Sequence, residues 1–143
     1  MELSALPFSE YAFPGPLRDQ LTAAVYSGIK TTTSSLHEAY AVWQEELPVA
    51  GTVQGVLDSE GVPRFATEIV KVEVKRMAEV DDAFAIAEGE GFAGAADWRA
   101  AHEAYWLSPA CVEDLGYTPA LGDDTLVVCE TVRVLSPEEL AAR

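Results

Sequence analysis

The sequence has little positive charge, and this shortage argues against one class of function. Lys and Arg together number 9 among 143 residues, against 24 Asp and Glu, and the formal net charge is −15. Proteins that bind duplex nucleic acid without sequence preference neutralise its phosphates with Lys and Arg. We therefore expect no general duplex DNA binding, although a local basic pocket could still hold one nucleotide or a small anion.

Cysteines and nucleotide-binding motifs are also scarce. Cys111 and Cys129 are the two cysteines; they form no CxxC pair and cannot alone supply a four-ligand metal site. The segment GEGFAG follows no predicted strand and precedes no Gly-Lys-Ser/Thr, so it is neither a dinucleotide fingerprint nor a phosphate-binding loop. The sequence therefore predicts no metal and no cofactor.

Long apolar runs are missing as well. No run is long enough to span a bilayer, and the acidic N-terminus, interrupted by Pro and Gly, does not resemble a signal peptide. We expect a cytoplasmic protein with free thiols and no membrane partner. The length and a hydrophobic content of 49% predict a single domain over residues 1–143, with residues 136–143 as a frayed C-terminal tail.

The spacing of apolar residues predicts four helices. Leu17, Leu21 and Val25 recur at helical intervals, Pro16 suits the first turn, and Gly28 suits the C-terminal stop. The other three helices are predicted in LHEAYAVWQEE (36–46), VDDAFAIAEGEG (80–91) and GAADWRAAHEAYW (94–106).

Strand patterns occupy the middle and the end of the chain. We predict strands over 52–58, 64–77 and 125–135, with the Val70, Val72 and Val74 side of the second one buried. The segment between 107 and 124 contains Pro and Gly and is predicted to be a loop. This order indicates an α+β fold, a small mixed β-barrel with an N-terminal helix and a helical insertion packed around it.

The segment SGIKTTTSS, from Ser27 to Ser35, is the first candidate for chemistry. Lys30 supplies a charge and three donors, and the five hydroxyls that follow it can donate, accept or act as nucleophiles. On an ideal strand Lys30 and Thr33 would point to opposite faces, so their cooperation requires a bend. The alternative is an exposed, Thr-rich edge strand that follows the end of a helix.

Acidic and aromatic residues give the other candidates. Glu88 extends the apolar series of Val80 and Phe84 by one turn, so it either borders a cleft or turns out to solvent, and the neighbouring Glu90 could reach the same place. His102 lies on one helical stripe with Trp98 and Trp106. These three residues are either packed core side chains or a platform on which a base could stack.

Glu130 is an acid among apolar residues of the last predicted strand. It shares strand parity with Val128 and Val132. Either the strand bulges, or the carboxylate points inward and needs a partner such as Lys30 or Arg18.

Five segments together resemble the longer bacterial branch of the ASCH domain family, small β-barrels related to the PUA fold. In chain order they are FPGPLRDQL, SGIKTTTS, AEGEG, WRAAHEAYW and LVVCETVRV, and they cover nearly the whole chain. The resemblance implies a cleft between barrel and helices, with Lys30 and Thr33 on one wall and Glu88 on the other. It also implies binding of RNA or a nucleoside-like small molecule.

Some small members of the family are amidohydrolases that remove the acetyl group from acetylated cytidine. They use a Lys, a Thr and a Glu, and by resemblance these catalytic roles fall on Lys30, Thr33 and Glu88. Within the TTT run, Thr31 or Thr32 is the alternative for the reactive hydroxyl. These enzymes are shorter than the present chain, so the resemblance alone does not transfer their activity to it. Amidohydrolase activity is therefore kept as the alternative to ligand binding. The residues expected to contact the ligand are Thr31, Thr32, Ser34, Glu90, Trp98, His102 and Trp106.

Overall fold

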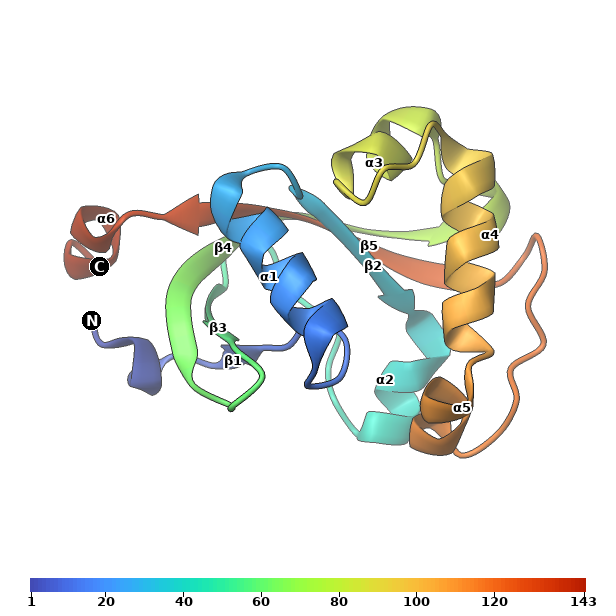
Figure 1. Ribbon diagram of the computed structural model, residues 1–143, viewed down its shortest axis with the longest axis horizontal. Helices are drawn as coiled ribbons and strands as arrows, with labels where there is room; N and C mark the ends of the chain where they lie inside the picture. The colour runs from blue at the N-terminus through green and yellow to red at the C-terminus, as the bar shows by residue number, and fades with distance from the viewer. The chain divides into compact units, whose positions relative to one another are not determined.

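The protein combines a mixed sheet with helices, as the sequence predicts (Figure 1). The computed structural model describes residues 1–143. Five strands form one sheet in the order β1-β3-β4-β5-β2. Because β1 and β2 end this order, the sheet is open and is not closed into a barrel. The α+β fold class is confirmed.

The helices and strands have the following bounds. The helices are α1 (Pro16–Ser27), α2 (His37–Trp43), α3 (Asp82–Ala87), α4 (Ala95–Trp106), α5 (Pro109–Leu115) and α6 (Pro137–Ala141). The strands are β1 (Phe8–Ser9), β2 (Thr32–Leu36), β3 (Val53–Leu57), β4 (Pro63–Arg76) and β5 (Leu126–Leu135).

The four predicted helices are all present, and their ends follow local sequence signals. Pro16 begins α1, and Gly28 ends it with a left-handed φ of 82°, a conformation that glycine adopts without strain. The Asp81 carboxylate accepts a hydrogen bond from the Phe84 N–H and so caps the N-terminus of α3.

Two segments differ from the sequence-based expectation. The predicted loop over 107–124 contains α5, which the Ser108 side chain caps and which begins with Pro109 and ends at Gly116. Residues 136–143, expected to form a frayed tail, begin with α6. Ser136 and Glu139 form a reciprocal capping box there, and Leu140 is buried.

The chain divides into two compact units, which we describe separately. Unit 1 comprises residues 1–31, 48–72 and 130–143. Unit 2 comprises residues 32–47 and 73–129.

Unit 1 contains β1, β3 and α1. β1 pairs with β3 in parallel, and β3 pairs with β4 antiparallel, with an irregularity between Val56 and Leu57. Val25 from α1 packs with Val56 and Tyr11 in one apolar cluster, and Leu140 from α6 joins a second cluster. The apolar face of α1 therefore lies on the sheet, as its sequence spacing predicts.

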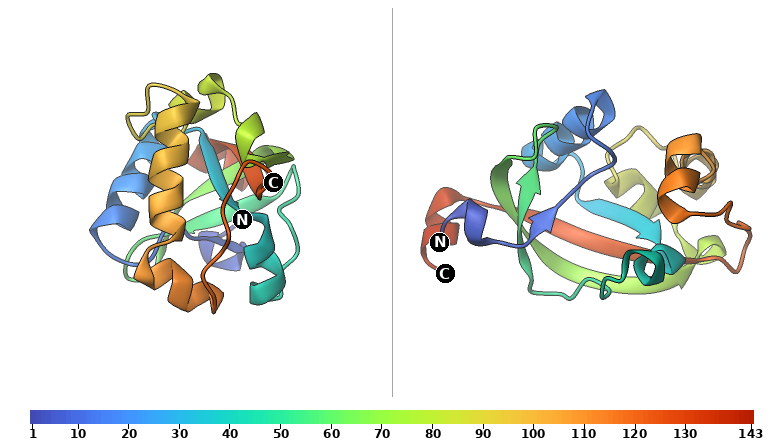
Figure 2. Two further views of the ribbon diagram at one scale, coloured as in Figure 1. Left: turned by 90° about the vertical axis from the view of Figure 1, so that its right-hand side faces the viewer. Right: turned by 90° about the horizontal axis from the view of Figure 1, so that it is seen from below.

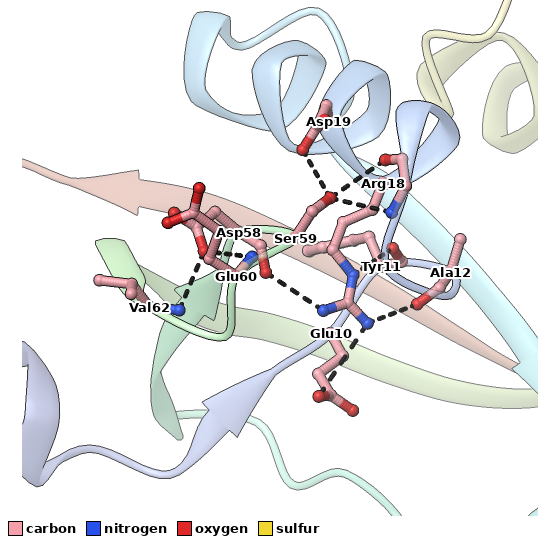
Figure 3. Close-up of polar contacts among 10 residues, drawn as sticks. Glu10, Tyr11, Ala12, Arg18, Asp19, Asp58, Ser59, Glu60 and Val62 are labelled. Atoms are coloured by element: carbon pink, nitrogen blue, oxygen red, sulfur yellow. Dashed lines mark hydrogen bonds and ion pairs between the residues drawn. The ribbon is translucent and has the colours of Figure 1, made fainter.

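A buried arginine joins three segments of unit 1 (Figure 3). Arg18 is only 3% exposed, and its guanidinium donates to the carbonyl oxygens of Tyr11, Ala12 and Asp58 at 3.3, 2.7 and 3.2 Å. The exposed Glu10 carboxylate lies 4.0 Å away. The arginine thus supplies donors to backbone groups that belong to neither a helix nor a strand ladder.

Unit 2 is built around tryptophans of α4. Its core cluster includes Trp98, Trp106, Ala85, Leu115 and Val127. α3 and α4 lie side by side and contact each other, as do α2 and α5 (Figures 1 and 2). None of the helices of the protein has the length and apolar character needed to cross a membrane.

The predicted burial of the valines in β4 is wrong at two positions. Val70 is 49% exposed and Val74 is 44% exposed. Period-two alternation separates the two faces of a strand, but it does not say which face is covered by other elements.

Candidate functional site

β2 presents two hydroxyls of the Thr/Ser run to the helical part of unit 2. The Thr32 hydroxyl donates to the Phe84 carbonyl of α3 at 3.0 Å, and the Ser34 hydroxyl donates to Glu88 Oε2 at 2.7 Å. Thr33 is half-buried on the opposite side of the strand, where the hydroxyl of Ser35 meets that of Tyr40 at 2.8 Å. The hydroxyl that contacts the candidate acid is therefore that of Ser34.

The Glu88 carboxylate is almost completely buried. Glu88 directly follows the last residue of α3 as its C-cap and is 1% exposed. Gly89 follows it with a φ of 68°, and this left-handed residue turns the chain away while the glutamate side chain stays inside. A buried carboxylate requires hydrogen-bond donors to compensate for the loss of water. Ser34 is one such donor.

α4 supplies the other contacts of the carboxylate. The indole N–H of Trp98 donates to Glu88 Oε2 at 2.6 Å, and His102 Nε2 lies 3.3 Å from Oε1. The same ring nitrogen lies 3.2 Å from the Ser34 hydroxyl. We refer to Ser34, Glu88, Trp98 and His102 as the Glu88 cluster.

The orientation of the His102 ring is fixed by its neighbours. Nδ1 lies 2.8 Å from the Trp98 carbonyl oxygen, and because a carbonyl only accepts, Nδ1 carries a proton. The ring also stacks on Trp98, with centroids 4.7 Å apart and planes 26° apart. Nε2 is consequently held toward Glu88 and Ser34.

The tryptophans of the stripe are buried in the core. Trp98 is 0% exposed and Trp106 is 6% exposed, so neither indole presents a free face to solvent. Phe92, which sequence reasoning overlooked, packs near His102 with ring centroids 5.8 Å apart. Its position after the Gly-Glu-Gly turn carried no periodic signal. The predicted stacking role of the tryptophans stays a prediction.

Lys30 and Thr31 belong to unit 1. Lys30 is 3% exposed, and its backbone N–H donates to the Ala24 carbonyl at 3.0 Å. Both residues line a hollow of about 230 Å³ together with Gly28 and Arg133. Lys30 is thus withdrawn from bulk solvent. The predicted cooperation of Lys30 and Thr33 with Glu88 stays a prediction.

Both cysteines are free thiols, as the sequence predicts. Cys129 is buried, and this burial raises the pKa of its thiol to about 12. At neutral pH the group is therefore a protonated, apolar part of the core and not a nucleophile.

Glu130 is a half-buried ionisable group of unit 1. Burial raises the pKa of its carboxyl from the usual 4.5 to about 7. Its negative charge also contributes, after burial, to raising the pKa of the nearby Tyr11 hydroxyl. Arg18, one of its two expected partners, donates to backbone carbonyls.

The raised pKa of Glu130 predicts a pH-dependent stability. Between about pH 4.5 and pH 7 the folded protein holds the proton of Glu130 and the unfolded chain does not. The contribution of Glu130 to the free energy of unfolding therefore falls as the pH rises through this window. The loss, complete above pH 7, should be on the order of 3 kcal/mol. Urea unfolding measures the free energy of unfolding at pH 5 and at pH 8. The difference between these two values should be smaller for Glu130→Gln than for the unmodified protein. Glu45→Gln, at an exposed position, is the charge-matched control.

An unchanged pH dependence in Glu130→Gln would contradict this assignment. It would mean that the carboxyl is hydrated in solution and titrates like a surface acid.

Comparison with known proteins identifies the class to which this fold belongs. An ASCH domain from Lactobacillus crispatus JV V101 has a similar structure, with a TM-score of 0.75, 26% identity, and coverage of 90% of this chain and 79% of its own. Protein EF3133 from Enterococcus faecalis V583 gives a TM-score of 0.74 and 27% identity, with 94% and 78% covered. No curated protein matches the chain significantly.

The family follows from the sequence match. The family model of the ASCH domain matches residues 9–136. The chain therefore belongs to the ASCH domain family.

Proposed function

We propose that the protein binds a nucleoside-sized ligand and that Glu88 recognises it. The observation that carries the proposal is the buried, oriented carboxylate of Glu88, which Trp98 and Ser34 hold through one oxygen while the other faces His102. A fixed carboxylate accepts hydrogen bonds from an exocyclic amine, as from the N4 amine of cytosine. A net charge of −15 disfavours a long RNA, so the proposed ligand is a nucleoside and not a polynucleotide.

The binding test compares nucleosides in the presence of a chelator. We expect cytidine and its N4-acetyl derivative to bind in calorimetric titrations, and Glu88→Gln to weaken binding at least about 10-fold. Glutamine keeps an acceptor for Trp98 but loses the charge that strengthens the bond to the ligand amine. Glu103→Gln, on the neighbouring helix α4 and paired with Arg99, is the control for removal of one carboxylate charge.

Two results would contradict the proposal. The first is the absence of binding by any nucleoside. The second is an equal loss of affinity in Glu88→Gln and Glu103→Gln. Titration with a short oligonucleotide at two salt concentrations distinguishes RNA binding from nucleoside binding. If the protein contacts RNA phosphates, its affinity for the oligonucleotide should fall as the salt concentration rises.

The second candidate function is hydrolysis of an N-acylated nucleoside, which the family resemblance favours. In this alternative the Thr33 oxygen attacks the amide carbonyl and its proton passes to a neutral Lys30 amine. Glu88 in its protonated form gives its proton to the departing amine and then takes one from the water that attacks the acyl carbonyl on Thr33. The carboxylic acid leaves, and Lys30 returns its proton to the Thr33 oxygen. Turnover of acylated nucleosides should then disappear in Lys30→Ala, Thr33→Ala and Glu88→Gln. A lack of turnover by the unmodified protein would discard the hydrolase and leave the binding function.

A further inference from the structure

Three potential metal ligands meet at one place in unit 2. One carboxylate oxygen each from Glu88 and Glu90 and a ring nitrogen of His102 all lie within 4.8 Å of one another. Glu90 stands between Gly89 and Gly91, whose φ angles of 68° and 89° are left-handed conformations that glycine adopts without strain. We propose that these three side chains bind a divalent transition metal ion such as Zn²⁺. The site goes beyond the proposed nucleoside function, although Glu88 belongs to both.

His102 has the second contact that metal-binding histidines require. In metal sites the ring nitrogen that does not bind the metal donates to a carboxylate or a backbone carbonyl, which fixes the tautomer. Here Nδ1 donates to the Trp98 carbonyl at 2.8 Å, a bond that lies outside the three-ligand group. A neutral His102 in this tautomer directs the lone pair of Nε2 toward Glu88.

The position of Glu88 agrees with tetrahedral coordination. Oε1 lies 3.3 Å from His102 Nε2. Two metal–ligand bonds of about 2.05 Å at a tetrahedral angle separate the ligand atoms by roughly 3.3 Å. The donors from Trp98 and Ser34 meet at Oε2, whereas the other oxygen, Oε1, is the one that faces His102.

The ligand types and their exposure define the kind of ion. One imidazole and two carboxylates suit Zn²⁺ and related transition metals, whereas Ca²⁺ and Mg²⁺ prefer oxygen ligands alone. Glu90 is exposed, which gives an ion access from solvent. Three protein ligands leave one tetrahedral position open for water or a ligand.

The test is a calorimetric titration of the chelator-treated full chain with Zn²⁺, without nucleoside. We expect one ion per chain, and at least about 10-fold weaker binding in His102→Ala and Glu90→Gln. His37→Ala is the matched control, because His37 is the other histidine and lines a separate hollow with Glu38 and Asp123. The visible spectrum of the Co²⁺-loaded protein should report tetrahedral coordination and lose this signature in His102→Ala.

Each contrary result has a defined meaning. Absence of Zn²⁺ binding would overturn the proposal and leave the contact of Glu88 with His102 as part of the packing of unit 2. Binding weakened equally by His37→Ala and His102→Ala, or binding of several ions unaffected by either, would assign the ions to the acidic surface. Glu90→Gln alters an exposed residue, so it tests the site even if His102→Ala fails to fold. Because nucleosides are titrated with chelator and Zn²⁺ without nucleoside, either proposal can fail while the other stands.

Discussion

Replacing Trp98 with alanine should lower the melting temperature by on the order of 10 °C. Trp98 is completely buried in the core of unit 2, and truncation of a buried tryptophan typically costs about 3–5 kcal/mol. For a chain of this length each kcal/mol corresponds to roughly 3 °C. The substitution also removes the indole donor of the buried Glu88 carboxylate. Differential scanning calorimetry measures the shift.

Trp43 provides the control for this prediction. Trp43 is 40% exposed, and its indole N–H donates to Asp114 at the surface. Trp43→Ala should therefore shift the melting temperature much less. Trp98→Phe keeps a six-membered aromatic ring but loses the N–H and the pyrrole ring. Its shift therefore combines the lost hydrogen bond to Glu88 with a smaller cavity than that of Trp98→Ala. Equal shifts for Trp98→Ala and Trp43→Ala would show that α4 does not hold this tryptophan in the core.

Replacing Arg18 with methionine should destabilise the protein by on the order of 3 kcal/mol. Methionine fills most of the space of the arginine stem, so the change acts mainly on the guanidinium. The carbonyls of Tyr11, Ala12 and Asp58 would lose their donors (Figure 3). A buried acceptor left without a donor costs about 1–3 kcal/mol. Chemical unfolding in urea measures the difference.

Arg64 is the matched control because it also contacts Asp58. Arg64 is 59% exposed at its side chain and forms one 2.6 Å contact with the Asp58 carboxylate. Arg64→Met should change stability far less, since exposed ion pairs contribute little. Arg18→Lys should recover little of the loss, because one ammonium cannot reproduce the guanidinium fork. A stable Arg18→Met protein would show that water replaces the guanidinium at these carbonyls.

Local signals in the sequence predict most of the helices and strands. The helix from Pro16 to Ser27 follows from its apolar spacing, its proline and the glycine after it. Similar signals are present at α5, where Ser108 and Pro109 mark the beginning of the helix and Gly116 marks its end. The Pro and Gly content of the whole segment nevertheless favoured the prediction of a loop. Closure of the sheet depends on pairing between distant strands, which local patterns do not contain.

The candidate site is predictable in part. Glu88 stood out because it continues an apolar helical series, and it is buried. Its partners depend on the approach of β2 and α4, and the pairing of Glu88 with Ser34 joins residues 54 positions apart. Glu88, Glu90 and His102 form no recognised metal-binding motif, so the sequence alone predicted no metal.

The connectivity of the two units limits how the protein can be dissected. The polypeptide passes from one unit to the other after residues 31, 47, 72 and 129. Trimming either terminus cannot yield unit 2 as a continuous fragment. A fragment restricted to it would require excision of residues 48–72 and a splice joining residue 47 to residue 73. Assays of Glu88 and His102 therefore call for the uncut polypeptide.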